Sequence, residues 1–262
     1  MKFCVAVALF LCAGLGLAQA PAGGSPGPLA YPEPESAAVW RSLAASYVRK
    51  AVRDEKLDKD PALNARIDAV MTAVGAAVAT VDPSFAGAPT SWKAILIEGF
   101  GRGAAAFPGE TILVDSTFVR NLSLSDDELA LILSHEAAHV VARHASAKLS
   151  FMAEFLGKEK LPTARTALLE FLAKDSYAEE FQPRARQQER EADTVGAAIF
   201  FASGYDLRRA LTLFDKLADM ESRATGRAGL PGQDSDTHDS AATRKQVIAG
   251  VIAGLQARGE PR

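Results

Sequence analysis

Residues 125–141 constrain the fold of this chain most, because they combine the signals of a buried helix with polar residues at its centre. Ser125 and Glu128 have the spacing of a capping box, which marks the start of a helix. Most of the following residues are apolar, but an H-E-x-x-H sequence places His135 and His139 four residues apart, on one helix face. Functional sites are the usual reason for such side chains in an apolar helix. The segment therefore predicts a core helix that carries a site.

This helix offers two ligands for a metal ion. The imidazoles of His135 and His139 can aim at one point, and Glu136 stands beside them, within reach of a water bound there. A catalytic zinc ion takes three protein ligands and keeps one position for water, so one ligand is missing. The chain has four histidines, the others being His144 and His238, and we therefore expect a carboxylate as the third ligand.

The best candidates for that carboxylate lie in the segment 187–193. Glu189 and Asp193 are four residues apart and share a helix face, whereas Glu191 points to another side. If Glu189 binds the metal, Asp193 can accept a hydrogen bond from the second ring nitrogen of a ligand histidine. Glu191 is expected to be a solvated helix charge, and it is the alternative to Glu189 as ligand.

The two remaining histidines are not assigned to the metal by the residues alone. His144 stands five residues beyond His139 and is turned about 140° away from it on the helix, so we expect a structural role for it. His238 stands among Gly, Pro and Asp residues, where a lone histidine is usually just exposed.

The first residues have the composition of an export signal. Lys2 precedes an apolar run and residues 18–20 (Ala-Gln-Ala) offer a cleavage site, so residues 1–20 are interpreted as a signal peptide. An uncleaved anchor is the alternative, although the run is short for a membrane span. Residues 21–36, rich in Pro, Gly and small residues, are expected to form a flexible leader. We expect a secreted protein, in the periplasm.

Composition limits the chemistry of the mature chain. Cys4 and Cys12 are the two cysteines and both lie in the expected signal, which leaves no disulfide and no cysteine nucleophile. The formal net charge is −3, and such mild acidity gives no reason to expect nucleic acid as a partner. Without an internal repeat or a second change in composition, residues 37–262 are expected to form one domain.

The order of elements predicts an α+β fold that is mostly helical, with a small sheet beside the H-E-x-x-H helix. Two helices and three short strands are expected before that helix, at residues 39–52, 61–78, 94–98, 101–107 and 111–114. Every clear pattern after the last strand is helical. Residues 148–182 predict amphipathic helices that are too short to span a membrane, and their role is open.

The two halves of the metal pattern together resemble a known family. H-E-x-x-H followed by E-x-x-A-D-x-x-G, here Glu189–Gly196, is similar to the HtpX- and BepA-like zinc metallopeptidases, metallopeptidase family forty-eight. The CAAX prenyl protease and the mitochondrial Oma-type protease belong to the same gluzincin group. Phe107–Val114 is similar to the family's A-x-P-G-G-x-I-x-V strand, Asp127–Ala130 to its D-E-L-A helix start and Gly204–Asp206 to its G-Y-D turn. The resemblance spans residues 60–255 and implies a zincin-like protease domain.

The resemblance also implies roles for individual residues. It implies that His135, His139 and Glu189 bind one Zn²⁺ per chain and that Glu136 is the general base of peptide-bond hydrolysis. Asp193 is expected behind the ligands.

A third part of the family pattern, T-H-P-x-x-x-x-R, corresponds to Thr237-His238-Asp239 and Arg244, with Asp in place of Pro. In the family this histidine is thought to stabilise the oxyanion or to cap zinc at rest. By resemblance, His238 would offer a donor to the oxyanion, steadied by Arg244.

A segment of small residues is expected to bind the substrate as an added strand, through its backbone and with broad sequence tolerance. Its members are Gly103, Ala104, Ala105, Ala106 and Phe107. The family has an Asn before this segment, where Gly103 or Ala104 stands here.

Two functions are compatible with this interpretation. The first is a secreted zinc endopeptidase for extended or misfolded envelope proteins, a substrate class taken from analogy with relatives. The second is a chaperone-like or adaptor protein that binds extended chains and rarely cuts, with His238 as a fourth ligand. Both take a protein or peptide as partner, and peripheral contact with the membrane or an envelope protein is open, as is the oligomeric state.

Overall fold

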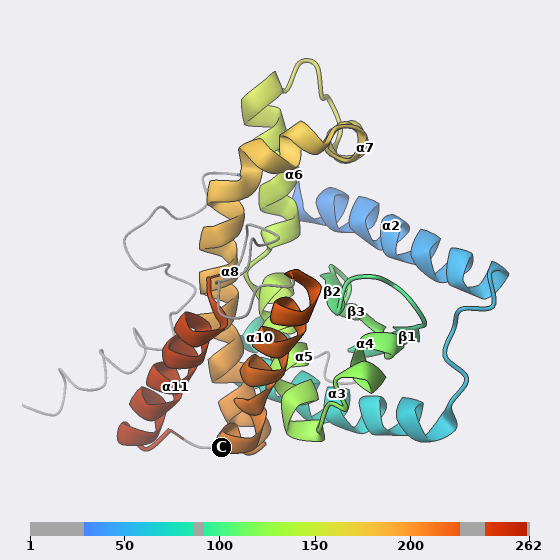
Figure 1. Ribbon diagram of the computed structural model, residues 1–262. Coiled ribbons are helices and arrows are strands. Elements are labelled where there is room, and N and C mark those ends of the chain that lie inside the picture. Colours follow the sequence, from blue (N-terminus) through green and yellow to red (C-terminus); the bar gives the residue numbers. More distant parts are fainter. Residues whose placement is uncertain (1–28, 86–91, 226–238, 261–262) are drawn as a thin grey trace, which may run out of the picture.

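The computed structural model describes residues 29–85, 92–225 and 239–260, with the backbone alone for residues 221–225. The expected signal peptide, the leader up to residue 28 and His238 lie outside the described residues. The described part is a mostly helical α+β fold with a three-stranded sheet, as the sequence predicts (Figure 1).

The first described helix, α2 (Glu33–Arg53), begins earlier than expected. Tyr31 is 1% exposed, and its hydroxyl donates a hydrogen bond to the carbonyl of Leu161 at 2.6 Å. Prolines at positions 32 and 34 then start the helix, because proline suits a first turn. The prediction of a leader over residues 21–36 is therefore wrong for residues 31–36.

The core is built around three helices, α3 (Pro61–Val81), α5 (Asp126–Val141) and α8 (Asp175–Ser203), which pack against one another. Asp60 caps α3, as expected from the Asp-Pro pair, and the apolar stripe of α3 is buried. By length and composition α3 could cross a membrane, but its buried stripe is what this core requires.

The sheet contains the three expected strands, β1 (Lys93–Ile97), β2 (Ala104–Phe107) and β3 (Thr111–Asp115). Their order is β1-β3-β2, with β1 parallel and β2 antiparallel to β3. The strand of small residues, β2, therefore lies at an edge of the sheet, and it packs beside α5.

A buried carboxylate fixes the start of α5. Glu128 closes the expected capping box with Ser125, and it also accepts hydrogen bonds from Thr212 and Lys216 of α10 (Thr212–Thr225), both at 2.7 Å. Burial opposes the ionisation of Glu128, but these donors outweigh it and lower its pKa. The start of α5 and the side of α10 are thus joined.

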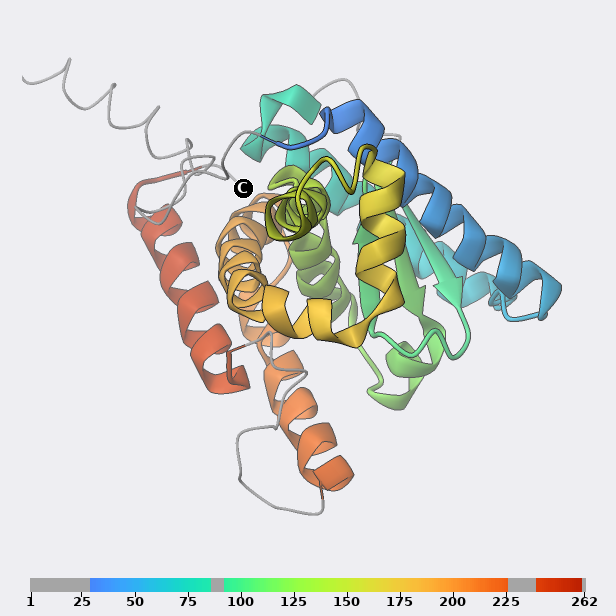
Figure 2. The same cartoon turned by 90° about the horizontal axis from the view of Figure 1, so that it is seen from above.

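The remaining elements surround this core. They are η1 (Pro83–Phe85), α4 (Ser116–Asn121), α6 (His144–Leu156), α7 (Ala164–Ala173), α9 (Leu207–Ala210) and α11 (Ala241–Ala257). Figure 2 shows α2 and α11 at opposite sides of the molecule, with α5 and α8 between them.

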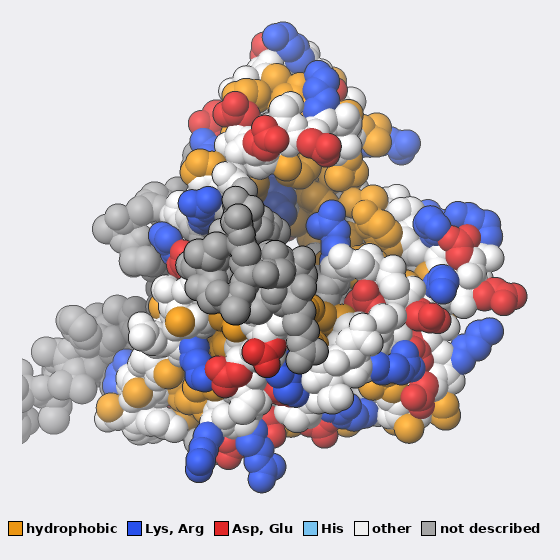
Figure 3. Space-filling model, in the orientation of Figure 1, with side chains coloured by type: hydrophobic (Ala, Val, Ile, Leu, Met, Phe, Trp, Pro, Cys, Tyr) orange, Lys and Arg blue, Asp and Glu red, His pale blue; other side chains and the backbone are white. Residues whose placement is uncertain are grey.

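The region of α6 and α7 contains the helices expected for residues 148–182, and it carries exposed apolar side chains at Phe155, Leu169 and Leu172. Hydrophobic atoms also gather between this region and α2 (Figure 3).

One ion pair joins the N-terminal helices to the end of the sheet, and it gives a test of the fold. Asp58, between α2 and α3, lies 2.6 Å from Arg120 of α4. The Arg120 guanidinium outweighs burial and lowers the pKa of Asp58 from 3.8 to about 2. We expect Asp58→Asn to lower the free energy of unfolding by roughly 1–2 kcal/mol at pH 7.

The pH dependence of that difference follows from the direction of the shift. Because the folded-state pKa is depressed, the contribution of Asp58 is present above about pH 4 and is lost as the pH falls through 2. Urea titrations between pH 7 and pH 2.5 measure it, with Asp68→Asn on the exposed side of α3 as control. A difference that stays constant over this range would contradict the assignment.

Candidate metal centre

Three potential ligand atoms converge between α5 and α8. They belong to His135, His139 and Glu189, and they all lie within 4.8 Å of one another. The histidines stand one turn apart on α5, and α8 crosses this face with Glu189. The structure thus brings together the three residues that the sequence suggested as ligands.

The distances between these atoms suit a tetrahedral ion. Ligand atoms at about 2.1 Å from a tetrahedral Zn²⁺ lie about 3.4 Å from each other. His135 Nε2 is 3.1 Å from both His139 Nε2 and a carboxylate oxygen of Glu189. His139 Nε2 is 3.6 Å from the other oxygen of Glu189. Two imidazoles and a carboxylate are also a common donor set of catalytic zinc, so these residues fit the ion.

Asp193 contacts the ring nitrogen of His135 that faces away from the other two candidate ligands. Its Oδ1 lies 3.0 Å from His135 Nδ1, and Arg244 donates two hydrogen bonds to the same carboxylate, at 2.7 and 2.8 Å. Burial raises the pKa of Asp193, but the contacts with His135 and Arg244 outweigh it and lower this pKa to about 2. For His135 burial lowers the pKa, whereas Asp193 and Glu189 raise it, to about 9.

Arg244 has a partner that the sequence pattern did not indicate. The sequence pattern placed Arg244 beside His238, which lies outside the described residues. Among the described residues Arg244 pairs with Asp193, and its guanidinium lies 5.5 Å from the ring centre of Phe214. A contact over fifty residues of sequence has no local signal, which is why the pattern did not predict it.

Asp239, the residue that replaces the family's proline, has a clear partner. Both its carboxylate oxygens accept hydrogen bonds from Arg190, at 2.8 and 2.9 Å. Arg190 follows Glu189 in α8. The salt bridge therefore ties the residue before Ser240, the N-cap of α11, to the helix that carries the carboxylate ligand.

Glu136 links the metal-binding helix to the edge strand. Its Oε2 accepts a hydrogen bond from the backbone N–H of Ala106 at 2.8 Å. This contact holds the carboxylate between the candidate ligand histidines and β2, and no local pattern in the sequence indicated it.

His144 lies where helical geometry did not predict it. The helix α5 ends at Val141, and Arg143 adopts the left-handed conformation, with φ 56° and ψ 34°. The ring of His144 therefore turns back, and its Nδ1 lies 2.8 Å from His139 Nδ1. The prediction that His144 faces away from His139 is wrong because the helix is not continuous. Arginine at a left-handed position carries no sequence signal of the kind that glycine gives.

Glu191 completes this second set of contacts. Its Oε2 lies 3.4 Å from His144 Nε2, and its side chain is 29% exposed, so the carboxylate that was expected to be a solvated helix charge is partly shielded and faces His144. Burial lowers the pKa of His144 to about 4, although Glu191 acts in the opposite direction. His144 is therefore neutral at pH 7.

Gly196 permits the close crossing of α5 and α8. A Cβ atom at this position would lie 2.9 Å from His135 Cα and 3.2 Å from the carbonyl oxygen of Ser134. Only a residue without a side chain fits against this backbone. Asp193 and Glu189 precede Gly196 on the same side of α8, so the crossing sets their distance from the histidines.

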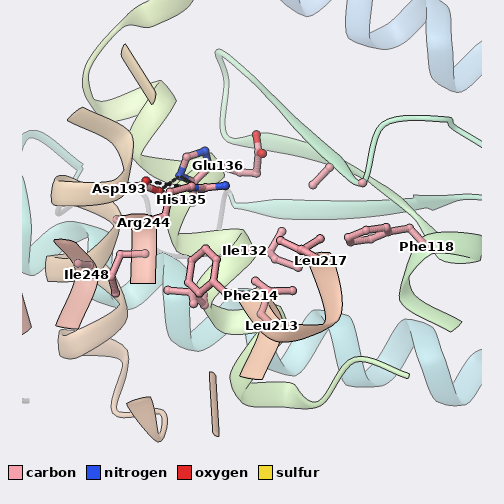
Figure 4. A pocket seen from close by; sticks show the side chains of 15 residues that line it. Phe118, Ile132, His135, Glu136, Asp193, Leu213, Phe214, Leu217, Arg244 and Ile248 are labelled. Atoms are coloured by element: carbon pink, nitrogen blue, oxygen red, sulfur yellow. Dashed lines mark hydrogen bonds and ion pairs between the residues drawn. The ribbon is translucent and has the colours of Figure 1, made fainter. Parts of the chain in front are cut away.

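A cavity of about 330 Å³ opens beside His135 and Glu136 (Figure 4). Gly103 and Ala104, at the start of the edge strand β2, line one part of it. Most of its wall is apolar and comes from α4, α5, α10 and α11, through Phe118, Ile132, Leu213, Phe214, Leu217 and Ile248. An apolar pocket therefore lies directly beside the polar residues His135, Glu136 and Asp193.

The crossing gives a sharp test of the metal site. Gly196→Ala should force α5 and α8 apart at His135, and we expect zinc affinity to fall about 10-fold or more, as when the surroundings of a ligand are disturbed. Chelator competition measures the affinity. Gly250→Ala is the matched control, because a Cβ atom there meets no atom within 4 Å. Equal zinc affinities of the two variants would contradict this role of Gly196.

Comparison with known proteins agrees with the geometry. Residues 61–251 match peptidase family M48. Three proteins named mitochondrial metalloendopeptidase OMA1 are similar. That of Arabidopsis thaliana is 28% identical over 165 residues, 61% of this chain and 31% of its own. That of Schizosaccharomyces pombe is 26% identical over 181 residues, 64% of this chain and 49% of its own. That of Saccharomyces cerevisiae is 25% identical over 144 residues, 54% of this chain and 41% of its own.

The chain thus spans less than half the length of each of these relatives. The family match is more extensive, since it covers well over half of the chain and includes both the H-E-x-x-H helix and the helix that carries Glu189. The chain belongs to peptidase family M48.

Proposed function

We propose that the chain is a zinc-dependent endopeptidase, with His135, His139 and Glu189 as ligands and Glu136 as general base. The observation that supports this most is the convergence of three ligand atoms at tetrahedral spacing beside a carboxylate that contacts the edge strand. When bound, zinc supplies a Lewis acid that polarises a carbonyl and lowers the pKa of water at its open position to about 7.

Glu136 is the group that we assign to proton transfer. Its carboxylate takes the proton of the attacking water and later delivers it to the nitrogen of the leaving amine. The hydrogen bond from the Ala106 N–H supports this role, because it fixes one oxygen of Glu136 between the ligands and the strand beside which a substrate would lie.

The substrate is an extended peptide that pairs with β2. The carbonyl of Gly103 accepts a hydrogen bond from β3 at 2.9 Å, and hydrogen-bonded pairs alternate along an antiparallel ladder. Ala105 therefore also faces β3, whereas Ala104 and Ala106 direct their backbone groups to the outer edge. The N–H of Ala106 donates to Glu136 there, so an added strand would pair with the backbone groups of Ala104 and the carbonyl of Ala106. A peptide can add there as a further strand, with little dependence on its side chains.

The apolar cavity gives this site a side-chain preference. Antiparallel strand pairs are slightly more stable than parallel pairs, so we take the peptide to pair antiparallel with β2. Its chain then runs from Phe107 towards Gly103. Because Glu136 contacts Ala106, we put the scissile bond beside Ala106, and the cavity lies towards Gly103 and Ala104. We therefore assign the cavity to a large apolar side chain directly after the scissile bond.

We infer that the protein acts outside the cytoplasm, in the cell envelope. The composition of residues 1–20 supports export, and pairing with an edge strand requires an extended chain. Extended or misfolded proteins of the cell envelope satisfy both conditions, as in protein quality control.

Replacing the general base tests the mechanism. We expect Glu136→Gln to lower the rate of cleavage of unfolded casein by about 10²–10⁴-fold, because the water proton loses its acceptor. The zinc content should stay unchanged, and Glu180→Gln, on the exposed side of α8, should behave as the wild type.

Equal rates of cleavage by the wild type and Glu136→Gln would contradict the mechanism. If the glutamine variant instead suppressed the aggregation of an unfolded protein as well as the wild type does, the chaperone-like alternative would be favoured.

Filling the cavity tests the side-chain preference. Leu217→Trp should lower kcat/KM about tenfold or more for a peptide with Leu or Phe after the scissile bond, and much less for its Ala analogue. Met220→Trp, 41% exposed on the same helix, is the control. Mass spectrometry of casein digests gives the cleaved positions independently. A frequent charged residue after the cleaved bond, or equal losses for both peptides, would contradict the assignment.

A further inference from the structure

We propose that His144 and Glu191 form a positioning pair for the zinc ligand His139, which fixes the tautomer and the orientation of its ring. The pair is distinct from Asp193 and Arg244, which contact the other ligand histidine. This inference rests on the proposed zinc site, and it adds two positioning residues to it.

The ring contacts assign each proton. His139 directs Nε2 to the ligand group, and a neutral histidine that binds a metal through Nε2 carries its proton on Nδ1. His139 Nδ1 lies 2.8 Å from His144 Nδ1, and only one of two nitrogens at that distance can carry the proton. His139 therefore donates and His144 accepts. The proton of His144 is then on Nε2, which points to the Glu191 carboxylate at 3.4 Å.

The two ligand histidines thus have different supports. His135 donates directly to a buried carboxylate, Asp193, which Arg244 neutralises. His139 donates to a neutral imidazole, and the carboxylate of Glu191 stands one group further away. Both carboxylates come from α8, so the helix that supplies the third ligand also orients the other two.

A strained backbone conformation at Arg143 keeps His144 in this position. Arg143 is a non-glycine residue with φ 56°, a strained conformation that is found most often where function requires it. Only this turn between α5 and α6 brings the His144 ring back onto His139, where it is 4% exposed. Both nitrogens of this buried ring have a partner, Nδ1 on His139 and Nε2 on Glu191, so the ring connects the two side chains.

Three substitutions of His144 and Glu191 test the pair. His144→Phe removes the acceptor and keeps a ring of similar size, and we expect zinc affinity to fall about 10–100-fold. His144→Asn puts an amide oxygen where Nδ1 was, so it should restore most of this affinity. Glu191→Ala should cause a smaller loss, whereas Glu180→Ala should cause none. Glu189→Ala removes a proposed ligand, so its loss of zinc affinity is the largest that we expect among these variants.

Two measurements separate positioning from packing. Chelator competition gives the zinc affinity, and the visible absorption of the Co²⁺-substituted protein reports the geometry at the metal. We expect a changed Co²⁺ spectrum for His144→Phe and a spectrum close to that of the wild type for His144→Asn. Equal losses for the Phe and Asn variants, or an unchanged spectrum and affinity for His144→Phe, would overturn the positioning role.

The proposed function and this inference can fail separately. A wild type that binds no zinc would refute both. A wild type that binds zinc, loses it in Glu189→Ala and keeps full affinity in His144→Phe would refute only the pair. If His144→Phe does not fold, the zinc affinities of Glu191→Ala and His144→Asn decide the question. The positioning role would also be overturned if Glu191→Ala kept the affinity of the wild type while His144→Asn lost most of it.

Discussion

The site depends on the backbone contact between α5 and α8 at Gly196. Two helices normally keep 8–10 Å between their axes because side chains separate them, and a glycine at the crossing allows a closer approach. Glu189 and Asp193 precede this point on the same side of α8, at distances set by the helical repeat. One small residue therefore determines whether a carboxylate from α8 reaches the histidines of α5.

Charge balance explains why so many polar groups can be buried here. Asp193 and Arg244 are both largely buried, and an unpaired charge at either position would be costly. Arg244 forms two hydrogen bonds with Asp193 and also packs over Phe214, which lines the apolar cavity. The same residues thus complete the polar side of the site and the wall of the pocket.

The sequence predicted those parts that follow from local rules. The capping box of α5, the Asp-Pro start of α3 and the three strands all depend on neighbouring residues. The ligand group could be anticipated because helical spacing puts His135 beside His139.

The misses have a different physical origin. Tyr31 is buried by a partner 130 residues away, and Arg244 meets Asp193 across 51 residues. His144 was misplaced because Arg143 ends a helix without the glycine that usually marks such a turn.

The buried carboxylate of Glu128 has a consequence for how this site could change in evolution. It accepts from Thr212 and Lys216, and the pocket-lining residues Leu213, Phe214 and Leu217 are carried by the same helix. The wall of the pocket is thus joined by hydrogen bonds to the start of α5, the helix that carries His135 and His139. Exchanges at Leu213 or Leu217 can therefore reshape the pocket while α10 keeps its place against α5, so the shape of the pocket and the geometry of the candidate ligands can vary independently.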